Sequence, residues 1–73
     1  MMSIGPQLKT YRVERGVTQM ELEISANLSH GVMSRIENNK INPKKETLLK
    51  IAKELGLQNQ EIAVLFGIEF EKF

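Results

Sequence analysis

Apolar residues recur at helical spacing in five segments of this 73-residue chain, and glycine or asparagine follows each segment. The first helix is predicted over residues 3–15, with Ile4, Leu8 and Tyr11 on its buried face and Gly16 at its end. The same pattern predicts four further helices, at residues 19–26, 30–37, 45–55 and 59–66. The connections are short and leave no room for a sheet, so the sequence predicts an all-α fold, a compact five-helix bundle.

The stretch over residues 18–40 predicts two short helices joined by a tight turn. Thr18 and Glu21 stand at the spacing of a capping box, in which each side chain satisfies an N–H group at the helix start. Asn27 tolerates the left-handed backbone that a sharp turn requires, and Ser29 is the predicted N-cap of the second helix. Four apolar side chains face the core from these elements: Leu22, Leu28, Met33 and Ile36. The stretch therefore predicts a helix-turn-helix.

The residues in and after this stretch match one family pattern without a gap: Gln19, Leu22, Leu28, Ser29, Met33, Ser34, Arg35, Ile36, Glu37, Lys40, Asn42 and Pro43. In this the chain resembles the Cro/repressor-type (XRE, lambda repressor-like) helix-turn-helix DNA-binding domains, from about Ile4 to about Phe66. The resemblance implies sequence-specific binding to double-stranded DNA by a transcriptional regulator, most simply a repressor. Residues 30–37 would then lie in the major groove.

In this docking mode, the start and the outward face of the second helix meet the base edges. The predicted base-contacting residues are His30, Gly31, Val32, Ser34 and Arg35. Arg35 is the strongest candidate because its guanidinium can donate to both acceptors of one guanine. The alternatives for Arg35 are an ion pair with Glu37 or Glu23, or a phosphate contact. Gly31 costs about 1 kcal/mol relative to Ala on an exposed helix, which suggests a close approach to DNA or to another helix.

A second set of polar residues is predicted to contact the DNA backbone, which fixes register without carrying sequence information. The resemblance implies that Gln19 bonds a phosphate, at a helix start where N–H groups and the dipole favour an anion. The full predicted set is Arg12, Gln19, Ser29, Asn38, Lys40, Asn42, Lys44 and Lys45. The alternative for the residues after the second helix is an ordinary hydrophilic loop.

Two internal charges bear on this site. The resemblance implies a structural ion pair between Arg12 and Glu37, which ties the first helix to the end of the third. Glu23 departs from the family, in which a small residue is usual at that position. A carboxylate there needs a partner or an exit to solvent, and Arg35 and Lys9 are the predicted partners.

The formal net charge is only +1, but its distribution is uneven. Residues 1–45 carry seven Lys or Arg against four Glu, a balance of +3, and residues 46–73 carry three Lys against five Glu, a balance of −2. The basic half contains the predicted helix-turn-helix, which favours a nucleic-acid partner. A solvated face without a binding role is the alternative.

Composition excludes most other classes. There is no Cys and no Asp, and the single His lacks a partner set, so we expect neither an enzyme nor a metal site, and no cofactor. No apolar run is long enough to span a bilayer, and the N-terminus lacks a signal-peptide pattern, so the expected location is cytoplasmic. The alternative function is a protein-interaction domain, such as an antitoxin or a regulator-binding module, with the same fold.

The predicted DNA-binding domain covers residues 1–67, and residues 68–73 form a C-terminal tail. The tail alternates apolar and charged residues, which is typical of a short strand or an extended arm. It could pack on the bundle, contact a second copy, or mark the cut edge of a longer protein. Domains of this kind usually bind palindromic operators as homodimers, with half-sites about one helical turn apart.

Overall fold

Five helices follow one another in residues 4–70, the part of the chain that the computed structural model describes. They are α1 (Ile4–Glu14), α2 (Gln19–Ser25), α3 (Val32–Glu37), α4 (Lys45–Glu54) and α5 (Asn59–Phe70). No strand occurs within these residues. The predicted all-α, five-helix architecture is therefore confirmed.

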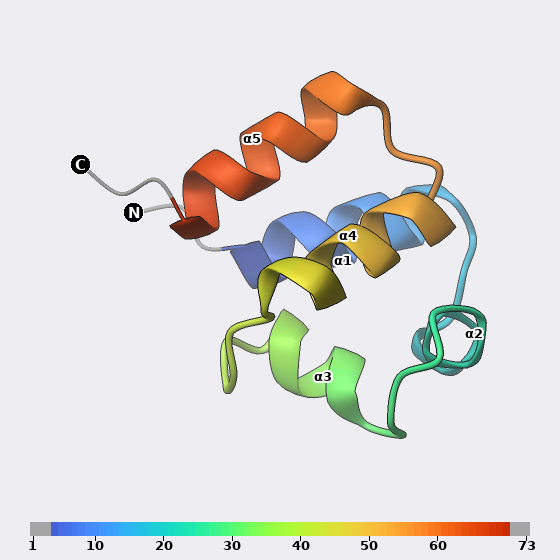
Figure 1. Ribbon diagram of the computed structural model, residues 1–73. Coiled ribbons are helices and arrows are strands. Elements are labelled where there is room, and N and C mark those ends of the chain that lie inside the picture. The colour runs from blue at the N-terminus through green and yellow to red at the C-terminus, as the bar shows by residue number, and fades with distance from the viewer. Residues whose placement is uncertain (1–3, 71–73) are drawn as a thin grey trace.

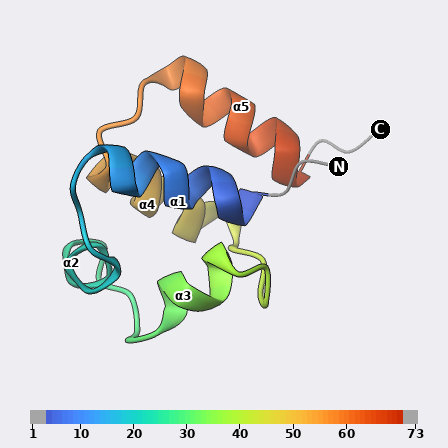
Figure 2. The ribbon, with the colours of Figure 1, turned by 180° about the vertical axis from the view of Figure 1, so that it is seen from behind.

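Two helices lie at the centre of the bundle, and the other three cover them from two sides (Figure 1). Helices α1 and α4 lie in the middle, α5 covers one side, and α2 and α3 lie on the other, as the view from behind also shows (Figure 2). Helix α3 contacts α1 and α2, while α5 contacts α1 and α4. The outer face of α3 is thus left at the surface of the molecule.

The core explains why these helices pack together. Its largest fully buried side chains come from all five helices: Leu8, Leu22, Met33, Ile36, Leu48, Ile51 and Leu65. Removing each of these from water contributes about 1.5–3 kcal/mol. Leu22, Met33 and Ile36 were predicted core residues, and Leu28 in the turn is half-buried against the same cluster.

Gly5 sets how closely α1 approaches the end of α3. A Cβ on Gly5 would collide with the carbonyl oxygen of Ile36 and lie 2.8 Å from that of Glu37. The start of α1 therefore touches the backbone at the C-terminal end of α3, which only a residue without a side chain permits. Nothing local in the sequence singles out Gly5, because the crowding comes from residues more than thirty positions away.

The start of α3 differs from the prediction. The helix was expected from residue 30 with Ser29 as its N-cap, but it begins at Val32, and Gly31 is the N-cap with a left-handed φ of 88°. No side chain at the cap position bonds the helix start. The left-handed residue turns the chain sharply, so Ser29 and His30 belong to the turn and precede the helix. Asn27 is left-handed as predicted, with φ 57°.

The end of α5 also differs. Gly67 was predicted to end this helix, yet the helix continues to Phe70, so the strand or extended arm expected from residue 68 is wrong for 68–70. Ile68 packs against the core. Burial of an apolar side chain outweighs the roughly 1 kcal/mol that glycine costs inside a helix. The rest of the predicted tail, residues 71–73, lies outside the described residues.

Candidate nucleic-acid interface

The start of α2 is held by the predicted capping box. The Thr18 hydroxyl accepts the Glu21 backbone N–H at 3.0 Å, and the Glu21 carboxylate accepts the Thr18 backbone N–H at 2.8 Å. The pKa of the Glu21 carboxyl is lowered below its ordinary value, first by the hydrogen bond from the Thr18 backbone N–H and then by the contact with the Thr18 hydroxyl. The box fixes the first turn of α2, which carries Gln19.

Arg12 and Glu37 form a buried, two-pronged ion pair between α1 and the end of α3, as predicted. The Arg12 Nε donates to Glu37 Oε2 at 2.7 Å, and its Nη2 donates to Oε1 at 3.1 Å. A third donor, Nη1, bonds the carbonyl oxygen of Val17 at 2.7 Å. The guanidinium is buried and donates three hydrogen bonds inside the domain, which gives Arg12 a structural role. The phosphate contact of Arg12 stays a prediction.

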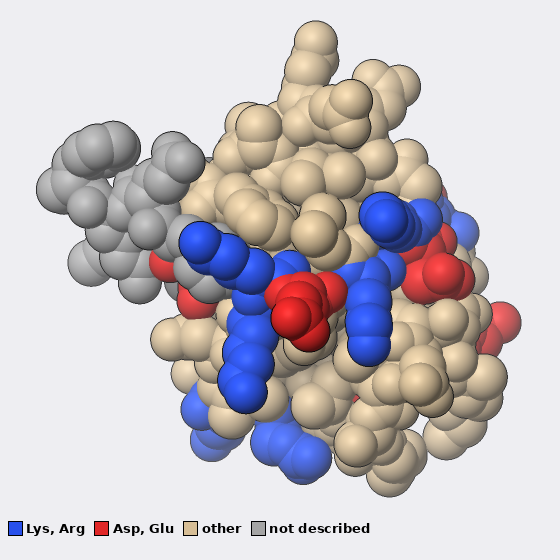
Figure 3. All heavy atoms as spheres, in the orientation of Figure 1, with Lys and Arg blue, Asp and Glu red and all other residues tan. Residues whose placement is uncertain are grey.

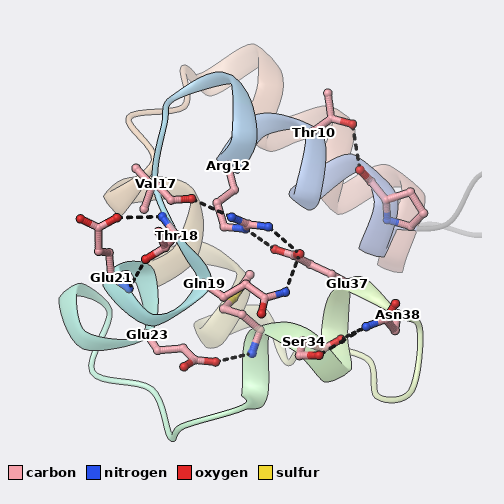
Figure 4. Close-up of polar contacts among 12 residues, drawn as sticks. Thr10, Arg12, Val17, Thr18, Gln19, Glu21, Glu23, Ser34, Glu37 and Asn38 are labelled. Carbon is pink, nitrogen blue, oxygen red and sulfur yellow. Dashed lines mark hydrogen bonds and ion pairs between the residues drawn. The ribbon is translucent and has the colours of Figure 1, made fainter.

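Gln19 joins this pair. Its Nε2 donates to Glu37 Oε1 at 3.0 Å, so the start of α2 is bonded to the end of α3 (Figure 4). The sequence had suggested only a phosphate contact for Gln19. An amide nitrogen carries two N–H groups, so this bond leaves one donor for another acceptor. We call the three side chains Arg12, Gln19 and Glu37 the C-terminal network of α3.

Glu23 has a different partner from those predicted. Its Oε2 accepts the backbone N–H of Met33 at 2.9 Å, and its Oε1 lies 3.8 Å from the Nδ1 of His30. Neither Arg35 nor Lys9 bonds it within the described residues. The prediction failed because the start of α3 places the Met33 N–H, and not the end of Arg35, on the Glu23 carboxylate.

Arg35 lies exposed on the outer face of α3. Its guanidinium folds back toward the helix start, where a Cβ on Gly31 would lie 3.3 Å from Nη1. The ion pair with Glu37 or Glu23 weighed from the sequence does not form among residues 4–70, because Glu37 pairs with Arg12 and Glu23 lies beside His30. The guanidinium is therefore left at the surface.

The remaining predicted contacts surround α3. Gly31, Val32 and Ser34 are half-buried at the helix surface. Exposed residues flank them in the turn before α3 and in the loop after it: Ser29, His30, Asn38, Lys40, Asn42, Lys44 and Lys45. Asn38 donates to the Ser34 carbonyl oxygen at 2.8 Å, which closes the end of α3. Apart from Arg12, none of the predicted contact residues is buried.

Seen from the side of α4, Lys and Arg side chains lie over α4 and below it, with acidic side chains between them, while the top of the view shows neither charge (Figure 3). Among residues 4–70 no group of three or more His, Cys, Asp or Glu is placed to hold a metal ion. In the same part of the chain, no helix is long and apolar enough to cross a membrane.

Two helices joined by a left-handed turn, with the second exposed and held at both ends, define a helix-turn-helix domain. A helix-turn-helix family profile matches residues 8–62, which is most of the chain. The chain therefore belongs to this helix-turn-helix family. The predicted helix-turn-helix family is confirmed, and the alternative of a protein-interaction domain is not favoured.

Three relatives are similar to the chain in sequence. An immunity repressor protein of Bacillus phage phi105 is 40% identical over 57 residues, which cover 78% of this chain and 40% of the relative. An uncharacterised HTH-type transcriptional regulator of Haemophilus influenzae is 38% identical over 50 residues, 68% of this chain and 51% of the relative. A third, from Sinorhizobium fredii, is 32% identical over 59 residues, 81% of this chain and 77% of the relative.

The matched region thus spans about half or less of the first two relatives. No solved structure matches the chain significantly.

Proposed function

We propose that this chain is the DNA-binding part of a transcriptional repressor that recognises a specific double-stranded sequence, with α3 in the major groove. The observation that carries the proposal is the exposed Arg35 on α3, whose possible internal carboxylate partners are engaged elsewhere. The name of the phage relative, an immunity repressor, supports repression over activation.

Sequence would be read by the start and outer face of α3. Arg35 donates to the two acceptors of a guanine, a contact worth about 1–3 kcal/mol of discrimination. Ser34 bonds a neighbouring base or phosphate, Val32 meets a thymine methyl group, and His30 donates from the turn. Gly31 keeps the backbone at the helix start close to the DNA.

Phosphate contacts on both sides of α3 would fix the register. Gln19 reaches one phosphate with the amide N–H that Glu37 does not use, at the start of α2. The loop after α3 supplies the other clamp. The proposed phosphate contacts are Gln19, Ser29, Asn38, Lys40, Asn42, Lys44 and Lys45.

We further propose that the protein binds a palindromic operator as a homodimer and acts in the cytoplasm. One domain with a formal net charge of +1 and a six-residue α3 offers few contacts. Two copies related by two-fold symmetry double them, with half-sites about one helical turn apart.

The test is iterative selection from a random duplex library, followed by binding to the selected duplex across a salt series. We expect a palindromic consensus and a log–log salt slope of about −0.9 for each phosphate contact. Arg35→Ala should lower affinity for that duplex about tenfold or more and relax preference at one base pair in each half-site.

Lys53→Ala is the matched control, since it removes one positive charge from an exposed position on α4. It should leave the base preference unchanged. Recovery of no consensus, or an Arg35→Ala variant that keeps full preference, would contradict the proposal.

A further inference from the structure

The Glu23 carboxylate is buried between α2 and α3, in a place where a charge is costly. Only 4% of the residue is exposed. Its carboxylate accepts the Met33 backbone N–H at 2.9 Å (Figure 4). It also lies 3.8 Å from the Nδ1 of His30, whose side chain is largely exposed. No Lys or Arg bonds it within residues 4–70. A buried carboxylate persists only where its contacts offset the loss of hydration.

The start of α3 lacks a local hydrogen-bond acceptor, and Glu23 provides one. An N-cap residue normally has extended backbone, and its side chain accepts the N–H of the second or third helical residue. Gly31 has neither property, because it has no side chain and its φ is 88°. Met33 is the second residue of α3, so Glu23 accepts the N–H that a local cap would have taken, and it does so from another helix.

We infer that Glu23 is a positioning residue for DNA readout: it holds the first turn of α3, and His30 beside it, in the orientation that enters the major groove. The inference rests on the proposed function. Glu23 contacts no DNA in this arrangement, since its carboxylate is directed inward onto the Met33 N–H. It acts through Val32, the neighbour of Met33, and through His30, whose Nδ1 lies 3.8 Å from the carboxylate.

Loss of this cap should affect sequence-specific binding more than general affinity. Base-edge contacts require side chains held to within about 0.5 Å, because each donor must meet one acceptor. Phosphate contacts by long Lys side chains tolerate larger shifts. Helix α3 has only six residues, so a loosened first turn is a large part of the reading surface.

The experiment compares Glu23→Ala, which removes the acceptor, with Glu23→Gln, which keeps a side-chain oxygen for the Met33 N–H. Glu54→Gln is the control, because it removes the same charge from an exposed position on α4. Each full chain is titrated with the duplex selected by the wild type and with a scrambled duplex. Exchange of the Met33 amide hydrogen is followed by NMR at a temperature where circular dichroism shows the chain folded.

For Glu23→Ala we expect faster exchange of the Met33 amide and about a tenfold loss of affinity for the selected duplex, the size of one weakened base contact. Affinity for the scrambled duplex should change less than about twofold, since no phosphate contact is removed. Glu23→Gln should restore most of the selectivity, and Glu54→Gln should match the wild type. If the Ala variant does not fold, Glu23→Asp replaces it, because the shorter side chain draws the carboxylate away from Met33.

Unchanged selectivity in the variant that lacks the Glu23 acceptor, or an equal loss of affinity for both duplexes, would overturn the inference and leave Glu23 a purely structural residue. A wild-type chain that prefers no duplex would instead overturn the proposed function. The two failures are distinguishable because the first requires a selective wild type.

Discussion

The two ends of α3 are held in different ways. At the C-terminal end, Arg12, Gln19 and Glu37 form a buried network of four hydrogen bonds to α1, to α2 and to the Val17 carbonyl oxygen. At the N-terminal end, one carboxylate from α2 accepts one backbone N–H. The end that follows His30 and Gly31 is therefore held by fewer side-chain hydrogen bonds.

This difference bears on the proposed role of α3 in DNA binding. The strong network sets the angle of α3 relative to the bundle and orients Gln19, whose second amide hydrogen is proposed to meet a phosphate. The single contact at the other end holds the first turn, which carries the residues proposed to meet the bases. The following predictions would break or sharpen this comparison.

The largest effect is expected from Glu37→Ala. It strands the buried Arg12 guanidinium, and breaking one partner of a buried ion pair costs about 3–5 kcal/mol. Urea denaturation should show this loss in the free energy of unfolding, while Glu54→Ala on the surface should show almost none. The double variant Arg12→Met with Glu37→Leu should be more stable than Glu37→Ala alone, since no buried charge remains. Equal stability of Glu37→Ala and the wild type would remove the asymmetry between the two ends.

Gly5→Ala tests the backbone contact at the same end. Its Cβ would meet the carbonyl oxygens of Ile36 and Glu37, so α1 and α3 must move apart, at a cost of about 1–3 kcal/mol. Gly67→Ala is the matched control inside α5, where nothing lies within 4 Å of the added Cβ. It should stabilise the protein by up to about 1 kcal/mol, the helix-propensity difference. Thermal unfolding of both variants measures the opposite signs, and a stable Gly5→Ala variant would show that α1 does not touch the end of α3.

At the N-terminal end, Gly31→Ala should cost about 1–2 kcal/mol, because an L-residue is strained at a φ of 88°. The added Cβ lies 3.3 Å from the Arg35 Nη1, which is the far end of a flexible side chain and can move aside. Gly31→Asn should cost less than Gly31→Ala, since Asn tolerates left-handed backbone. Chemical denaturation of the two variants gives the comparison, and equal losses would argue against the left-handed cap.

The smallest effect is expected from Glu21→Ala, which removes the carboxylate half of the exposed capping box of α2. The pKa of the Glu21 carboxyl is lowered in the folded protein, so its contribution to stability is present above the unfolded-state pKa and is lost as pH falls through the folded-state pKa. The melting temperature of the variant should be slightly below that of the wild type at neutral pH, and the two should converge in acid. A difference that persists at low pH would mean that the box contributes through something other than the carboxylate charge.

Much of the architecture follows from signals that act over a few residues. The five helices, the Thr18–Glu21 capping box and the left-handed Asn27 depend on periodicity and on groups within one turn, so they could be predicted. The Arg12–Glu37 pair was predicted only from the family resemblance, because its two residues are 25 positions apart.

The errors had a common cause. The start of α3 was placed two residues early because Ser29 is a good local cap, whereas the chain uses a left-handed Gly31 and a carboxylate from α2. Helix α5 was predicted to end at Gly67 because glycine is unfavourable inside a helix. The sequence does not reveal that Ile68 packs against the core, and this packing extends the helix.

The sequence by itself thus determined the helix-turn-helix and the order of the helices, because periodicity and helix caps depend on neighbouring positions. Only the tertiary structure decided which carboxylate meets which donor: Glu37 takes Arg12 and Gln19, and Glu23 takes the Met33 N–H. Gly5 likewise acquires its role from carbonyl oxygens of α3. These choices depend on distances between segments far apart in the chain, and packing of the shared core sets those distances.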